Sequence, residues 1–233
     1  MVNLVKTQLK RVVHPLMRSI KPAPTLRSEP LSTRWGTERG TPIDHYYLDR
    51  FIEANRADIT GDVLEIKNRF YTDRVGEGVT RADVLDIDAS NPKATIIADL
   101  AAADNVPSDR YDCFVLTETL QYIFDLRGAV GHAHRILKPG GVLLATVPCV
   151  SPIDRELEET EYWRFTKNSC RRLFGDAFGD GQVQVETYGN YASCTAWLTG
   201  MSLEEMDLDL MADDSEVFVQ GVCVRAIKRP EGV

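Results

Sequence analysis

The stretch YDCFVLTETLQYIFDLRGAVGHAHRILKPGGVLLATVP, residues 111–148, decides how the rest of the chain folds. It begins with an apolar run at 113–116 and ends with a second one at 142–147. Between them, apolar residues recur at helical spacing until a Pro-Gly-Gly break. This order of elements predicts two parallel strands that are joined by a crossover helix.

Both apolar runs are continuous rather than alternating, which is typical of strands that are buried on both faces. In such a sheet, ligands bind at the carboxyl ends of the strands. Thr117, Glu118 and Gln121 directly follow the first run. We therefore expect these three side chains to lie at a ligand site.

Further strands are predicted on both sides of this unit. Segments 61–66, 79–88 and 94–100 are short, apolar and end in or near an acid. Segments 182–190 and 215–228 are expected to form an antiparallel pair at the sheet edge. The spacing leaves room for one helical turn around 71–75 and for a loop around 91–92 in place of a full helix.

A helix is predicted just before the first strand, in the segment GTPIDHYYLDRFIEAN. Thr41 is a good N-cap residue, Pro42 fits the first helical position, and Asp44 stands where a capping-box acid belongs. This helix should pack against the sheet.

The first 34 residues differ in charge from the remainder. They carry a net charge of +6, which leaves about −14 for the rest of a chain whose total is −8. Apolar residues from Val2 to Ile20 fall on one helical face, although Pro15 should kink the helix. The prediction is a basic amphipathic helix and linker at 1–34, followed by one domain at 35–233. We expect the helix to dock on this domain or on a second subunit in a homodimer, with contact to a membrane surface as the alternative.

Composition excludes some classes of function and site. The net charge argues against nucleic-acid binding. Five cysteines without a CxxC pair favour a reducing, cytoplasmic location. No apolar run approaches the roughly 18 residues of a membrane span. His132 and His134 would point to different sides of a helix, so no metal site is expected.

Four quoted pieces, VLEI, ADL followed by YDCFVLTETLQYI, RILKPGGVLLATVP, and YWRFT with LF downstream, together resemble the class I S-adenosylmethionine-dependent methyltransferases. The resemblance covers roughly residues 61–178 and favours a methyltransferase type 11-like branch associated with polysaccharide and natural-product pathways. It implies a Rossmann-like doubly wound α/β fold, with a mostly parallel seven-stranded sheet and an antiparallel edge strand.

The resemblance also implies a cofactor, S-adenosyl-L-methionine, and roles for particular acids. Glu65 would lie near its methionine end, Asp88 would accept both ribose hydroxyls, with Asp86 as the competing candidate, and Asp99 would meet the adenine amino group. Ionised carboxylates suit these donors because they act only as acceptors. The remaining residues expected at the cofactor are Asn68, Leu100, Thr117, Glu118 and Gln121.

One segment departs from the family pattern. A glycine-rich turn usually follows the first acid, and here Lys67, Asn68 and Arg69 take its place. Two outcomes follow: either Asn68 adopts a left-handed conformation and the loop still closes, or the cofactor site is weakened.

The leading hypothesis is methyl transfer to a small-molecule acceptor, a sugar or a natural-product intermediate, by in-line displacement at the sulfonium methyl. Such a reaction depends mainly on positioning, with a base if the acceptor is a hydroxyl. The candidate bases are His45, Glu118, Asp154 and Tyr162. The alternatives are a non-catalytic scaffold or partner subunit and a different reaction that uses the same cofactor.

Overall fold

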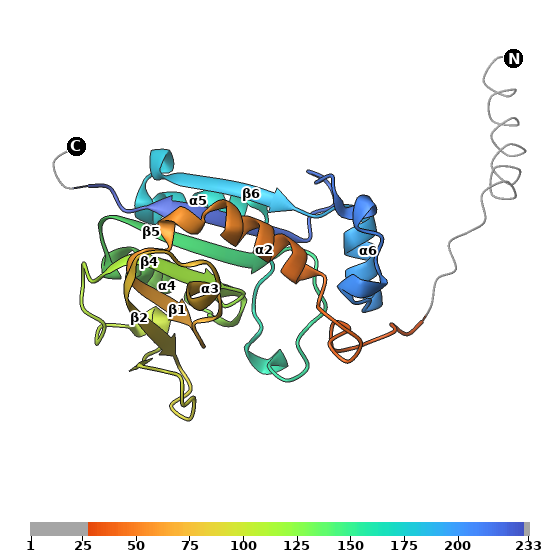
Figure 1. Ribbon diagram of the computed structural model, residues 1–233, viewed down its shortest axis with the longest axis horizontal. Helices are drawn as coiled ribbons and strands as arrows, with labels where there is room; N and C mark the ends of the chain where they lie inside the picture. Colours follow the sequence, from red (N-terminus) through yellow and green to blue (C-terminus); the bar gives the residue numbers. More distant parts are fainter. Residues whose placement is uncertain (1–27, 231–233) are drawn as a thin grey trace, which may run out of the picture. The chain divides into compact units, whose positions relative to one another are not determined.

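The computed structural model describes residues 28–230, and a seven-stranded sheet lies at its centre (Figure 1). Residues Met1–Pro30 and Leu31–Val233 form separate units, and the second holds the whole sheet. The strands are β1 Gly61–Ile66, β2 Val79–Asp86, β3 Ile96–Ile97, β4 Tyr111–Thr117, β5 Leu137–Pro148, β6 Val183–Tyr188 and β7 Gly221–Ile227. The predicted helix at 2–20 lies outside the described residues.

The α-helices within residues 28–230 are α2 Asp44–Ala54, α3 Phe70–Val75, α4 Leu126–Ile136, α5 Lys167–Phe178 and α6 Tyr191–Thr199. Within residues 28–230, no helix has both the length and the apolar character needed to cross a membrane.

The unit β4-α4-β5 is present as predicted, with its two strands side by side and parallel. Helix α4 ends at Ile136 because the residue before a proline, Lys138, avoids the helical conformation. Along β4, Phe114 and Leu116 pack into the hydrophobic cluster on one face of the sheet, and Cys113 and Val115 into the cluster on the other. The continuous apolar run thus reflects burial on both faces.

The strand order is β3-β2-β1-β4-β5-β7-β6. Strands β1 to β5 run parallel, whereas β7 is antiparallel to both β5 and β6. The mostly parallel seven-stranded sheet and its antiparallel pair are therefore confirmed. The reversed strand β7 lies between β5 and β6, so β6 forms the edge. The order reverses between β1 and β4, and this is where ligands bind in doubly wound sheets.

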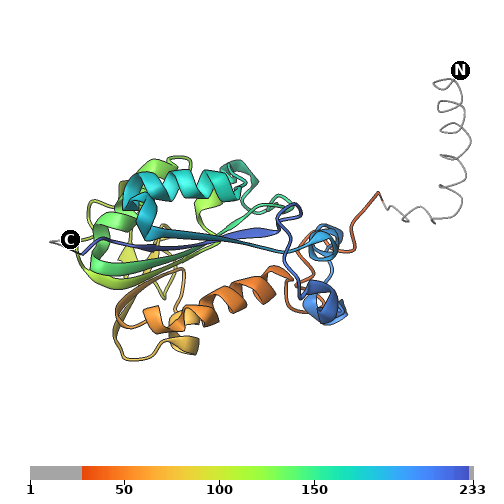
Figure 2. The same ribbon diagram turned by 90° about the horizontal axis from the view of Figure 1, so that it is seen from above.

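Helices cover both faces of the sheet. Figure 2 shows the sheet edge-on, with α4 and α5 on one side and α2 on the other. The buried face of α4 consists of Ala129, Val130, Ala133 and Ile136, which is the helical spacing that the sequence predicts. On the opposite side, Tyr47, Leu48, Phe51 and Ile52 of α2 are buried.

The connections on the β2 side are short, also as predicted. Helix α3 has six residues, and residues 87–95 form a loop where a doubly wound sheet would usually have a helix. Strand β3 has only two residues. A groove of ≈ 650 Å³ lies beside α3 and is lined in part by Phe70, Arg74, Val84 and Lys93. It lies between α3 and β2, because residues of both elements line it.

The start of α2 differs from the prediction. Thr41 does not cap the helix; its hydroxyl and its N–H both donate to the Glu204 carboxylate, at 2.8 Å each. Pro42 forms an isolated bridge with Ser202, and the helix begins at Asp44 without a side-chain cap. A partner more than 160 positions away in the sequence has replaced the local capping interaction.

Candidate functional site

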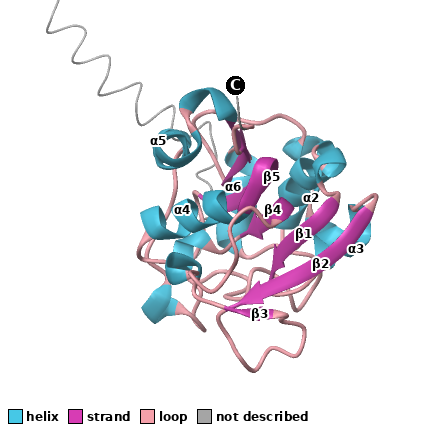
Figure 3. Cartoon of the chain, turned by 90° about the vertical axis from the view of Figure 1, so that its left-hand side faces the viewer, coloured by secondary structure: helices cyan, strands magenta, loops and turns pink. Residues whose placement is uncertain are grey.

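The acids and polar residues predicted at a ligand site do gather at one edge of the sheet. Strands β1, β2 and β4 are parallel and end at Ile66, Asp86 and Thr117. Figure 3 shows β1 and β2 side by side, with β3 at the margin. Because parallel strands place their carboxyl ends together, the segments that follow them form a single edge.

Glu65, near the end of β1, anchors the turn that leads into α3. One carboxylate oxygen accepts the N–H of Tyr71 at 2.9 Å, and the other accepts the N–H and the hydroxyl of Thr72 at 2.8 and 2.7 Å. The side chain is only 2% exposed. Its carboxylate therefore faces the first turn of α3, and we expect Glu65 to act on a ligand by holding this turn in place.

The glycine-poor turn adopts the left-handed conformation, but at Lys67 rather than at Asn68. Lys67 has φ +63°. Its N–H donates to Leu85 O at 3.1 Å, and its carbonyl accepts from the Asn91 side chain at 2.8 Å. The prediction for Asn68 is corrected: its side chain instead accepts the N–H of Phe70 at 2.8 Å. Contacts from the β2 side thus hold a lysine in a conformation that glycine adopts at low cost.

Replacing Lys67 with glycine should raise the free energy of unfolding by about 0.5 kcal/mol, because relief of the left-handed strain slightly exceeds the added entropy of the unfolded chain. Asn68→Gly is the matched control, and it should lower stability because a turn hydrogen bond is lost. Urea titrations of both variants measure the difference. A destabilised Lys67→Gly protein would show that the lysine side chain itself supports the turn.

Asp86 and Asp88 differ in how they are held. Strand β2 ends at Asp86, which is 8% exposed and accepts the N–H of Asp88 at 3.0 Å and the Asn91 side chain at 2.6 Å. Asp88 lies two residues beyond the strand and not at its end, which corrects the position expected from the sequence. Asp88 is exposed. Hydrogen bonds from the side chain and N–H of Ser90 lower its pKa, so it is ionised at neutral pH. Asp88 is therefore the carboxylate with open acceptor capacity.

Asp99 follows β3 and caps the short helical turn 100–102, accepting the N–H of Ala101 at 2.9 Å. The side chain remains exposed at the same edge as Asp88. Leu100 is buried in the core, at 3% exposure, so its side chain supports this turn from below. Glu65, Asp88 and Asp99 thus differ in role: Glu65 is buried and holds a turn, whereas Asp88 and Asp99 are exposed.

Thr117 ends β4, and Glu118 and Gln121 lie in the segment that follows this strand. Glu118 has φ +42°, and its N–H donates to both oxygens of Thr146, the carbonyl at 3.0 Å and the hydroxyl at 3.2 Å. Gln121 is 3% exposed, and its side-chain oxygen lacks a hydrogen-bond partner. Buried polar atoms are rarely left unpaired, so this orphan marks a place that a ligand can satisfy.

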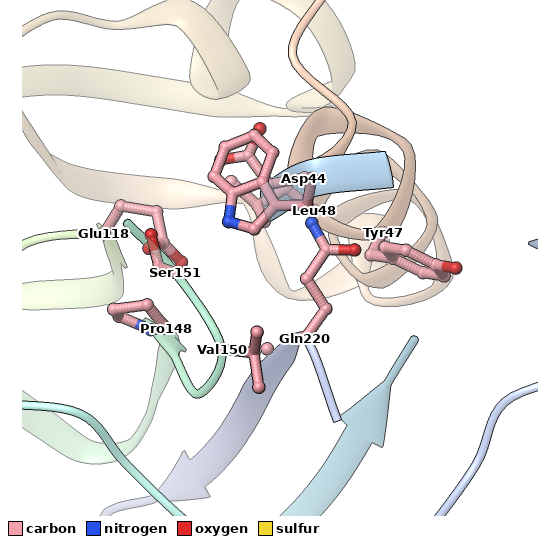
Figure 4. A pocket seen from close by; sticks show the side chains of 10 residues that line it. Asp44, Tyr47, Leu48, Glu118, Pro148, Val150, Ser151 and Gln220 are labelled. Carbon is pink, nitrogen blue, oxygen red and sulfur yellow. The ribbon is translucent and has the colours of Figure 1, made fainter. Parts of the chain in front are cut away.

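A small cavity of ≈ 30 Å³ adjoins Glu118. Figure 4 shows Asp44, Tyr47 and Leu48 on one wall, Glu118 and Ser151 on another, and Gln220 reaching toward α2. The remaining lining residues are Pro148, Val150, Trp197 and Gly221. The cavity has room for about one or two water molecules, or for the head group of a larger ligand.

Burial raises the pKa of Glu118 to about 8, and the charge of Asp44 adds to the effect. Arg164 opposes the shift, but it is paired with Glu161 at 2.7 Å. Burial also raises the pKa of Asp44. Glu118 is therefore mostly protonated at neutral pH and can act as a base once a ligand or a rise in pH removes its proton.

The contribution of Glu118 to the free energy of unfolding should fall as pH rises, and Glu118→Gln should remove this contribution. The unfolded Glu118 ionises near pH 4.3 and the folded one near about pH 8, so the folded state binds the extra proton between these values. We expect the Tm of the variant, relative to the parent, to rise across this window and then level off. Thermal scans from acid to alkaline pH measure the Tm of each protein, with Asp176→Asn as the control. Parallel Tm curves for Glu118→Gln and the parent would contradict this prediction.

The other candidate bases lie elsewhere. His45 follows Asp44 on α2 but does not line the cavity. Asp154 accepts the Tyr122 hydroxyl at 3.2 Å, and Tyr162 packs edge-on against Phe124 with its ring centroid 5.3 Å away. The structure thus brings only Glu118 of the four to the cavity. Three contributors were missed from the sequence: Asp44, interpreted as a cap, Asn91, which binds the turn, and Gln220.

No metal centre is formed by the part of the chain that is described: residues 28–230 hold no group of three or more His, Cys, Asp or Glu side chains placed around one point. His134 packs edge-on against Phe178, whereas His132 accepts a hydrogen bond from Arg135.

A family model described as a methyltransferase domain matches residues 51–177. A search of curated protein sequences finds no match. Among solved structures, the chain is similar to an S-adenosylmethionine-dependent methyltransferase from Mesorhizobium loti, with 16% identity, a TM-score of 0.54, and coverage of 79% of this chain and 99% of that one.

Two further structures share the architecture. Phosphoethanolamine N-methyltransferase 2 of Haemonchus contortus, bound to phosphomonomethylethanolamine and S-adenosylhomocysteine, has 14% identity and a TM-score of 0.52, over 78% of this chain and 53% of that one. The present chain therefore spans about half the length of that enzyme. The cyclase SpnF has 14% identity and a TM-score of 0.53, over 96% and 94% of the two chains. Identities this low establish a common fold and no more.

Proposed function

The chain belongs to the methyltransferase domain family of S-adenosylmethionine-dependent enzymes, and from this premise we propose that it transfers a methyl group to a small-molecule acceptor. The acceptor proposed is a sugar or a natural-product intermediate. The observation that carries the proposal is that two sites lie at the same edge of the sheet: exposed acids after β2 and β3, and a small cavity lined by the half-buried acids Asp44 and Glu118.

The residues at the first site fit the cofactor, S-adenosyl-L-methionine. Asp88 and Asp99 offer exposed carboxylates to ribose hydroxyls and to an adenine amine, which are donors. The left-handed turn at Lys67 lets backbone approach a ligand closely, and the orphaned oxygen of Gln121 can accept from an ammonium group. When bound, the cofactor supplies an electrophilic methyl group on a sulfonium.

The protein's own contribution is positioning and proton removal. The turn after β1 and the segment after β4 orient the reactants, which accounts for most of the acceleration in a displacement of this kind. We assign proton removal to Glu118 because it is the candidate base that lines the cavity. The roles first predicted for His45, Asp154 and Tyr162 stay predictions.

Partners and compartment are proposed on similar grounds. A net charge of −8 disfavours nucleic acid as the acceptor. The five cysteines are all free, which suits a reducing cytoplasm. Homodimer formation and membrane contact through the N-terminal helix stay predictions.

The test is calorimetric titration of the parent protein with S-adenosylmethionine, followed by mass analysis of acceptors incubated with both. Saturable heat and a product heavier by one CH₂ group would support methyl transfer. A titration without saturable heat would show that the protein does not bind S-adenosylmethionine, and the proposed methyl transfer would then be wrong.

A second candidate is a different reaction with the same cofactor, because the cyclase SpnF shares the fold over 96% of this chain. It predicts cofactor binding and a changed acceptor without the added CH₂ group. A non-catalytic scaffold, the third alternative, predicts that no acceptor is changed at all.

A further inference from the structure

The cavity beside Glu118 is lined by two acidic side chains and by no positively charged one among the described residues. Among the described residues that line it, Asp44 and Glu118 are the titratable carboxyl groups, and none is Lys, Arg or His. Arg164 is a cation whose charge lowers the pKa of Glu118, and its guanidinium already binds Glu161 and the carbonyl of Pro152, at 2.7 and 2.8 Å. The lining residues therefore supply no counter-charge, although the neighbouring His45 lowers the pKa of Asp44 through its charge.

Gln220 is held in the cavity wall with an unsatisfied side chain. It is 3% exposed, and neither atom of its amide has a hydrogen-bond partner. Its backbone cannot turn away, since its N–H donates to Tyr188 O at 2.8 Å and its carbonyl accepts from Cys149 and Val150 at 2.8 and 3.1 Å. The indole N–H of Trp197, 5% exposed, is also unpaired. Such groups are costly unless a ligand pairs with them.

The chemistry of the wall selects among ligands. An anion would meet two acids in a poorly solvated space, and an apolar group would leave Gln220 unpaired. A hydroxyl has one hydrogen to donate, whereas an ammonium group has several and also brings the missing positive charge. A small cationic amine therefore pairs with the acceptors of the wall, which are the two carboxyl groups and the Gln220 amide oxygen; the N–H groups of Gln220 and Trp197 are donors and receive no acceptor from it.

We propose that this cavity binds the amino group of the acceptor, with N–H donors shared among Glu118, Asp44 and the Gln220 carbonyl oxygen. The identification of the amine as part of the acceptor rests on the proposed methyl transfer, whereas amine binding itself does not. At ≈ 30 Å³ the cavity admits the amine and little more, so the body of the ligand lies outside it. The substrate class is an amine-bearing small molecule.

Binding should release a proton. At neutral pH the Glu118 carboxyl group is mostly protonated, and an entering R–NH₃⁺ converts it to a carboxylate paired with the ammonium, with H⁺ passing to solvent. The charged or titratable groups that act on Glu118 are Asp44 from α2, Glu161 and Arg164 from the loop after β5, and Cys223 of β7. The charges of Glu161 and Arg164 offset each other because the two side chains form an ion pair. Asp44 is therefore the second carboxyl group that pairs with the ammonium.

The test follows the Trp197 indole N–H resonance by NMR in the whole protein, identified through Trp197→Phe, without S-adenosylmethionine. Ethylammonium chloride is titrated against sodium chloride at equal ionic strength, and ethanol serves as the uncharged probe. We expect a saturable shift with ethylammonium, at least tenfold weaker with ethanol and in Glu118→Gln, and unchanged in Asp176→Asn. Proton release is measured calorimetrically in buffers of different ionisation enthalpy.

Equal shifts from ethanol and ethylammonium, or equal affinity in Glu118→Gln and the parent, would overturn the proposal, as would a titration with no shift at all. Because none of these readouts needs the cofactor, their failure would leave the S-adenosylmethionine titration intact. Conversely, if the protein binds the amine but not the cofactor, the proposed methyl transfer is wrong and the proposed amine site is still supported.

Discussion

Replacement of Glu65 with alanine is expected to lower the free energy of unfolding by about 3 kcal/mol, the largest loss from any single residue at the site. Its carboxylate accepts three hydrogen bonds, from the two N–H groups at the start of α3 and from the Thr72 hydroxyl. All of these donors belong to buried residues, and alanine would leave them without a partner. Burial raises the pKa of Glu65, but these hydrogen bonds oppose the shift.

Urea denaturation followed by circular dichroism measures this loss. The matched control is Asp125→Ala, which removes an exposed helix cap from α4, a single bond to the Gly128 N–H at 3.0 Å. That change should cost about 1 kcal/mol. If the two variants lose equal stability, the anchor at Glu65 contributes no more than an ordinary cap.

Replacement of Asp88 with alanine should weaken S-adenosylmethionine binding about 100-fold while leaving stability nearly unchanged. Two hydrogen bonds from ribose hydroxyls to an ionised carboxylate contribute about 3 kcal/mol together, and every 1.4 kcal/mol is tenfold in affinity. Asp88 is exposed, so its removal opens no cavity in the core.

The competing assignment is tested by Asp86→Asn in the same calorimetric titration. Asp86 is already bonded to Asn91 and to the Asp88 N–H, so its amide variant should disturb binding less than Asp88→Ala. Asp104→Ala, an exposed acid away from the strand ends, controls for net charge. A greater loss in Asp86→Asn than in Asp88→Ala would reverse the assignment.

The sheet and its ligand edge could be predicted because they depend on local patterns. The continuous apolar runs required burial on both faces, and the segment 61–66 is a strand with the predicted bounds. The positions of Asp88 and Glu118 at the carboxyl edge follow from the parallel direction of the strands. These features need only the order of residues along short segments.

The features that were missed depend on contacts between distant segments. The Asn91 side chain donates to the carbonyl of the left-handed Lys67 across 24 positions, and no pattern within the turn itself indicates this contact. The Glu204 carboxylate accepts a hydrogen bond from the Thr41 hydroxyl, so Thr41 does not cap the helix. Asp44 is instead the first helical residue, and it lines the cavity rather than forming a capping box. Gln220 carries no local signal because its orphaned amide is defined only by the packing around it.

The short pairing at the β2–β3 margin has a consequence for the order in which the protein loses structure. Strand β3 pairs with β2 over two residues, and the loop 87–95 brings no helix to support it. Regions with few packed contacts open at a lower free energy than the whole molecule. Asp88 and Asp99 flank this margin, so a molecule held by both would close the loosest part of the sheet. Its measured affinity would then include the free energy of ordering that margin, and any change that stiffens the loop should tighten binding without touching the ligand.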